Sequence, residues 1–202
     1  DFKHSQISVE TQLSEKWKRV WHLVNKIVES RDLSNSDLQL ANLKEAHLNK
    51  ANLREANLQG AILESANLKQ ADLWGAKLQG ANFKKANLEE VNFQEANFDK
   101  KADFQEAVLR KADLLEVTLE EANLQGANLQ DAQLKVANFQ KADLQGANLQ
   151  RAYFRGARLQ QANFQEANLE EAVFQEANLR GTTFKKANLK KTTFIGEDLT
   201  EV

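Results

Sequence analysis

The chain has 202 residues, of which 42% are hydrophobic and 28% are charged, and its formal net charge is −2. This composition excludes an intrinsically disordered chain, and the near-neutral charge argues against a protein that coats nucleic acid, which needs clustered Lys and Arg. Pro, Cys and Met are all absent, so disulfides, thiolate nucleophiles and Cys-ligated metals are excluded.

The targeting signals leave the compartment open. No apolar run approaches the roughly 20 residues needed to cross a bilayer, so we expect no membrane insertion. The sequence begins at Asp1 rather than Met, and a removed signal peptide stays an alternative. We expect the cytoplasm, with the periplasm or the thylakoid lumen as the other compartments to consider.

The N-terminal part of the chain differs from the rest. Residues 1–7 carry no pattern and are predicted to form a loose tail. Over residues 8–30 apolar side chains recur at helical spacing, which predicts an amphipathic helix. Such a helix could lie on a membrane or bind a partner helix, but we favour an N-terminal α-helical cap, because the first coil of a solenoid needs a cover. Its apolar face consists of Leu13, Trp17, Val20, Val24 and Ile27.

Residues 31–202 repeat a five-residue unit, most regularly from Ala122 to Gln150. Leu or Phe occupies the third position of all 34 units, Ala the first position of 27 units, and Asn or Asp the second position of 23 units. Neither an α-helix nor a flat strand has this period, so the chain must turn every five residues. The first and third positions should point inward, and all eight Gly fall at the fifth position, where a corner needs unusual backbone angles.

These tandem Ala-Asn/Asp-Leu/Phe-x-x units closely resemble the pentapeptide repeat family, which is abundant in bacteria and especially in cyanobacteria. The resemblance covers about 170 of the 202 residues. It implies an all-β solenoid, a right-handed quadrilateral β-helix in which four units form one square coil and about eight coils stack by backbone hydrogen bonds.

The distribution of Phe agrees with four sides. We number the sides by the unit whose third residue is Leu38 (side one), Leu43 (side two), Leu48 (side three) or Leu53 (side four), and every fourth unit returns to the same side. Of the ten solenoid Phe, four fall on side two and four on side four, and none on side three. Opposite walls should therefore carry the large rings.

Two irregularities interrupt the repeat. Six residues instead of five separate Phe98 from Phe104, which predicts a one-residue insertion near residues 99–101 that bulges from a corner. Towards the C-terminus Thr182, Thr192 and Glu197 replace the inward Ala, so we expect the coil to open to water there. No capping helix follows, and a homodimer through the uncapped C-terminal coil is a hypothesis.

No catalytic or cofactor site emerges from the residue types. The three His lie far from any Ser, Asp or Glu constellation, and the paired Glu, such as Glu89 and Glu90, belong to a convex rod without a cleft. The second-position Asn and Asp occur on every side, so backbone capping and stacking explain them better than a metal ladder. On side three the charges of the fourth and fifth positions alternate in sign from the second coil onwards, which favours a scaffold surface. We expect no enzyme and no cofactor.

Side four is the candidate binding surface. Six of the nine large apolar residues at outward positions lie there, and its second position loses Asn for four successive coils, from Gln133 to Thr193. Clustered aromatic, aliphatic and Arg side chains are typical of protein interfaces. The alternative is that β-branched residues here only favour strand packing or cover a self-association surface. The candidate residues are Trp74, Leu115, Val136, Tyr153, Arg155, Val173 and Ile195.

The sequence therefore predicts a non-enzymatic module that presents one face of a rigid β-helix to a protein partner. The alternative comes from the resemblance, since some family members mimic duplex DNA and bind DNA gyrase or topoisomerase. Mimicry needs a continuous negative surface, which this sign-alternating chain lacks. We do not expect direct nucleic-acid binding.

Overall fold

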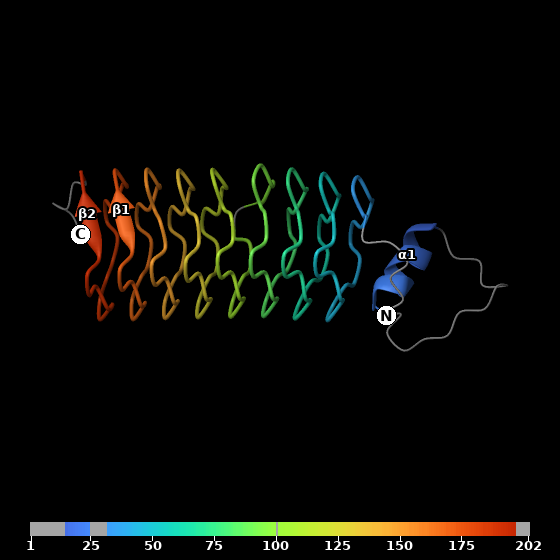
Figure 1. The fold of residues 1–202 in the computed structure, drawn as a ribbon, viewed down its shortest axis with the longest axis horizontal. Coiled ribbons are helices and arrows are strands. Elements are labelled where there is room, and N and C mark those ends of the chain that lie inside the picture. Colours follow the sequence, from blue (N-terminus) through green and yellow to red (C-terminus); the bar gives the residue numbers. More distant parts are fainter. Residues whose placement is uncertain (1–14, 25–31, 100, 197–202) are drawn as a thin grey trace.

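The computed structural model describes residues 15–24, 32–99 and 101–196. Helix α1 (Glu15–Val24) precedes a long solenoid, whose last two coils contain the strands β1 (Val173–Gln175) and β2 (Thr193–Ile195). Figure 1 shows the coils stacked in one row from the α1 end to the C-terminal end. The predicted tail and the flanks of the predicted helix lie outside the described residues.

The coils stack in a register of twenty residues. Parallel bridges join Asp32 to Asn52 and Asn52 to Asp72, and the same spacing recurs along the chain. Each side contributes both bond directions: the Leu53 amide donates to the carbonyl of Asp72 at 2.7 Å, and the Asp72 amide donates to the carbonyl of Ala51 at 2.9 Å. Four five-residue units per coil are thereby confirmed.

The fifth position of the unit forms the corner. Among the described residues, positive φ angles occur there in eight Gly and in 25 residues of other types, one of which is Lys141 at 58°. The amide of Ala142 then donates to the carbonyl of Phe139 at 3.0 Å, which closes a four-residue turn. Gly fits the corner without strain, but the repeat imposes this conformation on any residue placed there.

The second-position Asn and Asp support the backbone as the sequence predicts. Asn123 accepts a hydrogen bond at Oδ1 from the amide of Gln125 at 3.2 Å, and its Nδ2 donates to Asp103 in the preceding coil at 3.1 Å. Equivalent bonds recur around the solenoid. Within the described ranges no three His, Asp or Glu side chains are grouped so that they could hold a metal ion.

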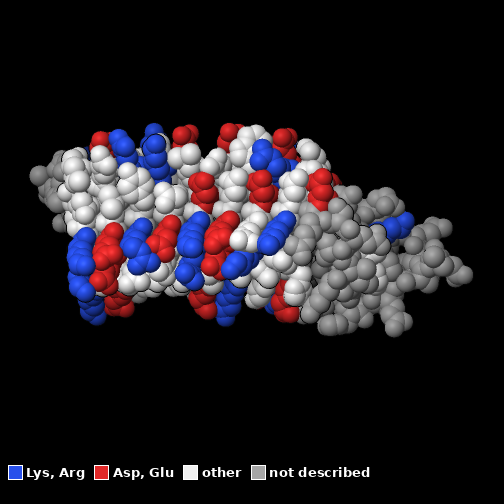
Figure 2. All heavy atoms as spheres, in the orientation of Figure 1, with Lys and Arg blue, Asp and Glu red and all other residues white. Residues whose placement is uncertain are grey.

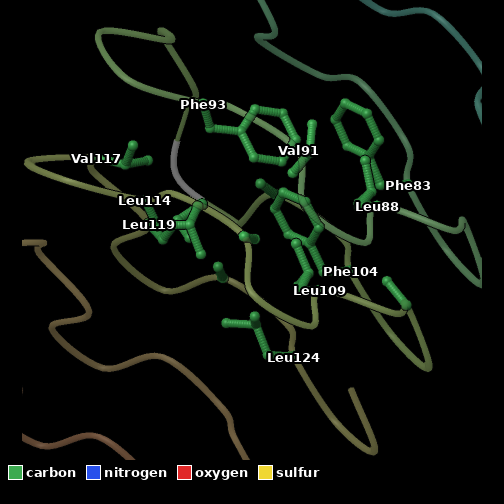
Figure 3. Close-up of a cluster of buried hydrophobic side chains, with 14 of the residues drawn as sticks. Phe83, Leu88, Val91, Phe93, Phe104, Leu109, Leu114, Val117, Leu119 and Leu124 are labelled. Atoms are coloured by element: carbon green, nitrogen blue, oxygen red, sulfur yellow. The ribbon is translucent and has the colours of Figure 1, made fainter. Parts of the chain in front are cut away.

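Phe and Leu side chains fill the interior together with Ala (Figure 3). Phe83 stacks on Phe104 with ring centroids 5.1 Å apart and an interplanar angle of 3°, and it meets Phe93 from the opposite wall edge-on at 5.8 Å. The prediction that opposite walls carry the rings is confirmed. Val91 and Val117 occupy the first position in place of Ala and remain buried.

The insertion is absorbed without loss of phase. Lys77 pairs with Asn97, twenty residues on, whereas Asn82 pairs with Asp103, twenty-one residues on. The stacked rings of Phe83 and Phe104 lie on either side of this change, so the inward columns continue through it. Residue 100 itself lies outside the described part of the chain.

The two ends of the rod differ. At the N-terminal end Val20 of α1 is buried in the same apolar cluster as Leu33 of the first coil. At the C-terminal end Thr182 stays buried because its hydroxyl donates to the carbonyl of Leu159 at 2.8 Å. The interior opens later than the Ala replacements alone suggest: Leu189 is 39% exposed, and Phe194 is only partly buried. Glu197 lies outside the described residues.

Among the helices that the structure describes, none is long and apolar enough to span a bilayer.

Candidate protein interface on side four

The second position of side four divides the rod into two halves. In the first five coils Asp alternates with Asn, and in the last four neither residue occurs. Bridges connect the successive members in register, so they form one continuous column. In chain order the column is Asp32, Asn52, Asp72, Asn92, Asp113, Gln133, Tyr153, Val173 and Thr193.

The N-terminal half is a closed polar network around Asp72. Its Oδ1 accepts hydrogen bonds from the Trp74 amide at 3.1 Å and from Nδ2 of Asn92 at 3.0 Å, while Oδ2 accepts from Nη1 of Arg54 at 3.0 Å. The same guanidinium lies 4.5 Å from the centre of the Trp74 ring. Trp74 is thus held by a cation–π contact within the chain.

The C-terminal half replaces this network with strand pairing. Val173 pairs with Thr193 and Gln175 with Ile195 in parallel register, and β1 and β2 are the only named strands of the described solenoid. An Asn or Asp at the second position ties its oxygen to the amide two residues on, and Val and Thr make no such bond here. The pairing agrees with the interpretation that β-branched residues favour strand packing here.

The structure brings five of the seven candidate residues together. Trp74 lies four coils from Tyr153, about 19 Å at ~4.8 Å per coil. Leu115 lies in the last coil of the first half, together with Asp113. The remaining residues occupy four adjoining coils and form what we call the side-four strip: Val136, Tyr153, Arg155, Val173 and Ile195.

Val136 has the most unusual backbone of the strip. Its φ is 59°, and it is the only β-branched residue with positive φ in the described part of the chain. Its side chain is 45% exposed, and its Cγ2 would lie 3.6 Å from a Cβ placed on Gly156 in the next coil. A β-branched side chain is disfavoured in the left-handed region, so Val136 is an unexpected residue for a corner.

Charged side chains surround the side-four strip but largely spare it. Figure 2 shows an uncharged area towards the C-terminal end, beside a row in which basic and acidic residues alternate. The alternating row matches the ion pairs of side three, where Lys69 lies 2.7 Å from Glu89 and Lys190 lies 2.9 Å from Glu170. The sign alternation that the sequence predicts is thus confirmed as a ladder of contacts.

The ladder also shifts the titration of its carboxylates. The hydrogen bond from Arg151 lowers the pKa of Asp131, and the bond from Lys190 lowers the pKa of Glu170. The hydrogen bond from Gln70 lowers the pKa of Glu90. These shifts reflect surface pairs that stabilise the rod.

Lys135 was missed by sequence reasoning, although it lies against the side-four strip. The amide of Val136 donates to the carbonyl of Arg155 at 2.8 Å, which sets Lys135 and Arg155 side by side at the fourth position. Counting back twenty residues from Arg155 would have identified Lys135, because residues twenty apart in the sequence are neighbours in adjacent coils.

Comparison with known proteins agrees with this architecture. The family pattern described as Pentapeptide repeats matches in 8 copies, over residues 32–64, 66–100, 102–137, 137–175 and 162–200. The solved structure of HetL, a pentapeptide repeat protein involved in heterocyst differentiation regulation from the cyanobacterium Nostoc sp. strain PCC 7120, is 34% identical with a TM-score of 0.60. The alignment covers 82% of this chain and 77% of HetL.

Two further structures are more distant. QnrB1, a plasmid-mediated fluoroquinolone resistance protein, is 20% identical over 73% of this chain and 72% of its own, with a TM-score of 0.48. The pentapeptide repeat protein Rfr23 from the cyanobacterium Cyanothece 51142 is 25% identical over 68% of this chain and 90% of its own, with a TM-score of 0.38. Both likenesses are too weak to bear on function. Comparison with curated proteins gives no match.

Proposed function

Because the chain belongs to the pentapeptide repeat family, whose members are right-handed quadrilateral β-helices, we propose that it is a non-enzymatic interaction module that presents the side-four strip to a protein partner. The observation that carries the proposal is the break in the Asn and Asp column from Gln133 onwards, where Val136 and Ile195 are 45% and 54% exposed. Exposed apolar residues beside a neutral surface are the usual core of a protein interface.

The regular units contain all the residues that the fold needs, so departures from them suggest a function. Ala, Asn or Asp, and Leu or Phe suffice to fill the interior and cap the turns, as Asn123 and Phe83 illustrate. Tyr153 and Val173 replace an Asn or Asp and therefore forgo the hydrogen bond to the amide two residues on. These two residues give up a hydrogen bond that stabilises the rod and add nothing to the packing of the interior, which supports a role on the outer surface.

The test is capture of a partner from an extract of the source cells. We expect wild-type protein to retain a specific partner and the double variant Tyr153→Asp and Val173→Asp to lose it, because two carboxylates would enter an apolar contact. The matched control is Asn148→Asp and Asn168→Asp, which places the same charges at the second position of side three. Equal capture by the side-four variant and the wild type would disprove the assignment of this face, provided that circular dichroism shows both variants folded.

A mimic of duplex DNA that binds gyrase is not favoured by the surface. Duplex DNA carries about one negative charge per ~1.7 Å of its axis, whereas side three alternates Lys69, Glu89 and Arg110 within ion-pair distance. Inhibition of gyrase supercoiling by the purified protein would revive this alternative.

We also propose roles for the two ends of the rod. Burial of Val20 beside the first coil supports α1 as the N-terminal cap. The exposed Leu189 and partly buried Phe194 support pairing of two copies through the C-terminal coil. Light scattering at rising concentration should show a dimer in the wild type that Leu189→Asp abolishes, and a wild type that stays monomeric at the highest concentration would contradict the pairing.

A further inference from the structure

The corner beside the side-four strip holds two cations in successive coils of one column and a third cation on the next side. Lys135 and Arg155 occupy the fourth position of side four in neighbouring coils, and Arg158 follows around the corner at the second position of side one. We call these three residues the cationic corner. Backbone pairing, including the bond from the Val136 amide to the Arg155 carbonyl, fixes their arrangement.

Lys135 and Arg155 break the charge pattern of the solenoid. They are one coil apart in the same column, which corresponds to roughly 4.8 Å between backbones. Over residues 32–99 and 101–196 no other two cations share a column in successive coils. Many other cations stack on an acid instead, as in the Lys44–Glu64 pair at 2.9 Å. Like charges placed opposite each other are destabilising, so a folding role does not account for the pair.

The cationic corner is also incompletely neutralised. The Nε of Arg155 lies 3.6 Å from a carboxylate oxygen of Glu176, longer than a charge-assisted hydrogen bond, and both side chains are about half exposed. The ion pairs of the described residues include neither Lys135 nor Arg158, and both side chains are exposed. In its own column Arg158 is flanked by the uncharged Asn138 and Asn178.

An apolar floor lies between these cations. Val136 extends over the backbone of Gly156, which has no side chain, and Gly156 separates Arg155 from Arg158 along the chain. Tyr153 lies at the second position of the same coil. A bound partner would therefore contact apolar surface in the centre and positively charged side chains at the edge. Protein interfaces commonly have such an apolar core and a polar rim.

We propose that the cationic corner and the side-four strip bind an acidic segment of a protein partner, with apolar side chains of that segment on Val136 and Tyr153 and its carboxylates against Lys135, Arg155 and Arg158. This rests on the proposed function of side four and adds the chemistry of the partner. Guanidinium groups bind carboxylates in a planar, bidentate geometry, which suits the two arginines.

Nucleic acid fits this surface less well. Asp131, Glu171 and Glu176 border it and would repel a phosphate backbone, whereas a peptide can place its carboxylates between them. The outside of a duplex also has no apolar groups that could pack against the apolar surface of Val136 and Tyr153. The observations thus favour an acidic peptide segment over DNA or RNA.

The test is selection from a displayed library of random 12-residue peptides on the folded full chain. We expect the enriched peptides to be rich in Asp and Glu and to contain Phe, Leu or Trp. Binding of a selected peptide should weaken at least tenfold in Arg155→Glu with Arg158→Glu, and should weaken as NaCl rises, because partly exposed charges are screened. The control, Lys84→Glu with Lys185→Glu, makes the same change of charge on side two and should bind like the wild type.

The single variant Arg158→Glu covers the case in which the double variant unfolds, because Arg158 has no ion pair to lose; at least threefold weaker binding is expected. Enriched peptides without acidic excess, no enrichment at all, or unchanged binding in Arg158→Glu would overturn the inference. Binding of a 20-base-pair duplex that the double variant abolishes would overturn it in favour of nucleic acid. Loss of the cell-extract partner in the Tyr153 and Val173 variant would still uphold the proposed function in any of these cases.

Discussion

Asp131 accepts two hydrogen bonds from Arg151 in the next coil, one of 2.7 Å from Nε and one of 3.0 Å from Nη2. This contact joins both carboxylate oxygens of Asp131 to one guanidinium on side three. The lysine pairs of the same side use single contacts, such as Lys191 to Glu171 at 3.1 Å. The fork of a guanidinium matches a carboxylate and fixes the two coils relative to each other.

Stability should fall in acid partly through this contact. The hydrogen bond from Arg151 lowers the pKa of Asp131 in the folded protein, so the folded state binds its proton less readily than the unfolded state. The contribution is fully present above the unfolded pKa, about 3.9, and is lost as the pH falls through the lower folded value. Urea unfolding at pH 7 and pH 3 should show a smaller acid loss in Asp131→Asn than in the wild type. Glu116→Gln, which removes a carboxylate outside the ladder, is the control, and an acid loss equal to that of the wild type in Asp131→Asn would contradict the prediction.

Ring stacking should make Phe174 one of the most sensitive core positions. It lies between Phe154 at 4.7 Å and Phe194 at 5.2 Å, nearly parallel to both. Phe174→Ala should cost about 3–5 kcal/mol of unfolding free energy, because it leaves a cavity in a fully buried column. Phe194→Ala removes the same side chain at the open end and should cost clearly less. Equal losses in guanidinium unfolding would show that the two sites are equally packed.

Relief of the corner at Val136 should trade binding for stability. Val136→Gly removes a β-branched residue from the left-handed region and should raise the unfolding free energy by about 0.5–1 kcal/mol, since Gly adopts that region without penalty. Partner capture should weaken because the apolar floor is lost. A variant that is less stable than the wild type, or that binds equally well, would indicate that Val136 is a packing residue.

Gly146 allows the cost of the corner conformation to be measured alone. Its φ is 65°, and a Cβ placed on it would have no neighbour within 4 Å. Gly146→Ala should therefore cost about 1 kcal/mol from backbone conformation only. Gly60→Ala adds a contact, because its Cβ would lie 2.7 Å from Cδ2 of Leu40, and should cost more. Identical thermal shifts in the two variants would mean that Leu40 moves away freely.

The repeat made most of the fold readable from sequence. Fixed spacing turns position in the chain into position in space, so the inward columns, the opposite Phe walls and the pairing of Asp131 with Arg151 follow once four units are assigned to a coil. The burial of Thr182 could not be predicted, because its hydroxyl donates to the Leu159 carbonyl of another coil and that distance is known only from the structure.

The candidate site was readable only in part. Counting outward residues on side four found Tyr153 and Val173, which the structure places in adjoining coils. It also included Trp74, which lies four coils from Tyr153 and contacts Arg54 instead. Composition of a face does not show whether its members are neighbours along the rod. The left-handed backbone of Val136 likewise becomes meaningful only when its angle is known.

The twenty-residue register makes length changes unequal in effect. Loss of one whole coil would shorten the rod and leave every later residue on its own side. Loss of a single five-residue unit would turn everything after it by one side, so that Tyr153 and Val173 would continue a different wall from Trp74. The one-residue insertion before Phe104 escapes this rule because the bridges resume on the same side with a spacing of twenty-one residues. Relatives of this chain should thus differ in length by whole coils wherever a face is shared between the two halves of the rod.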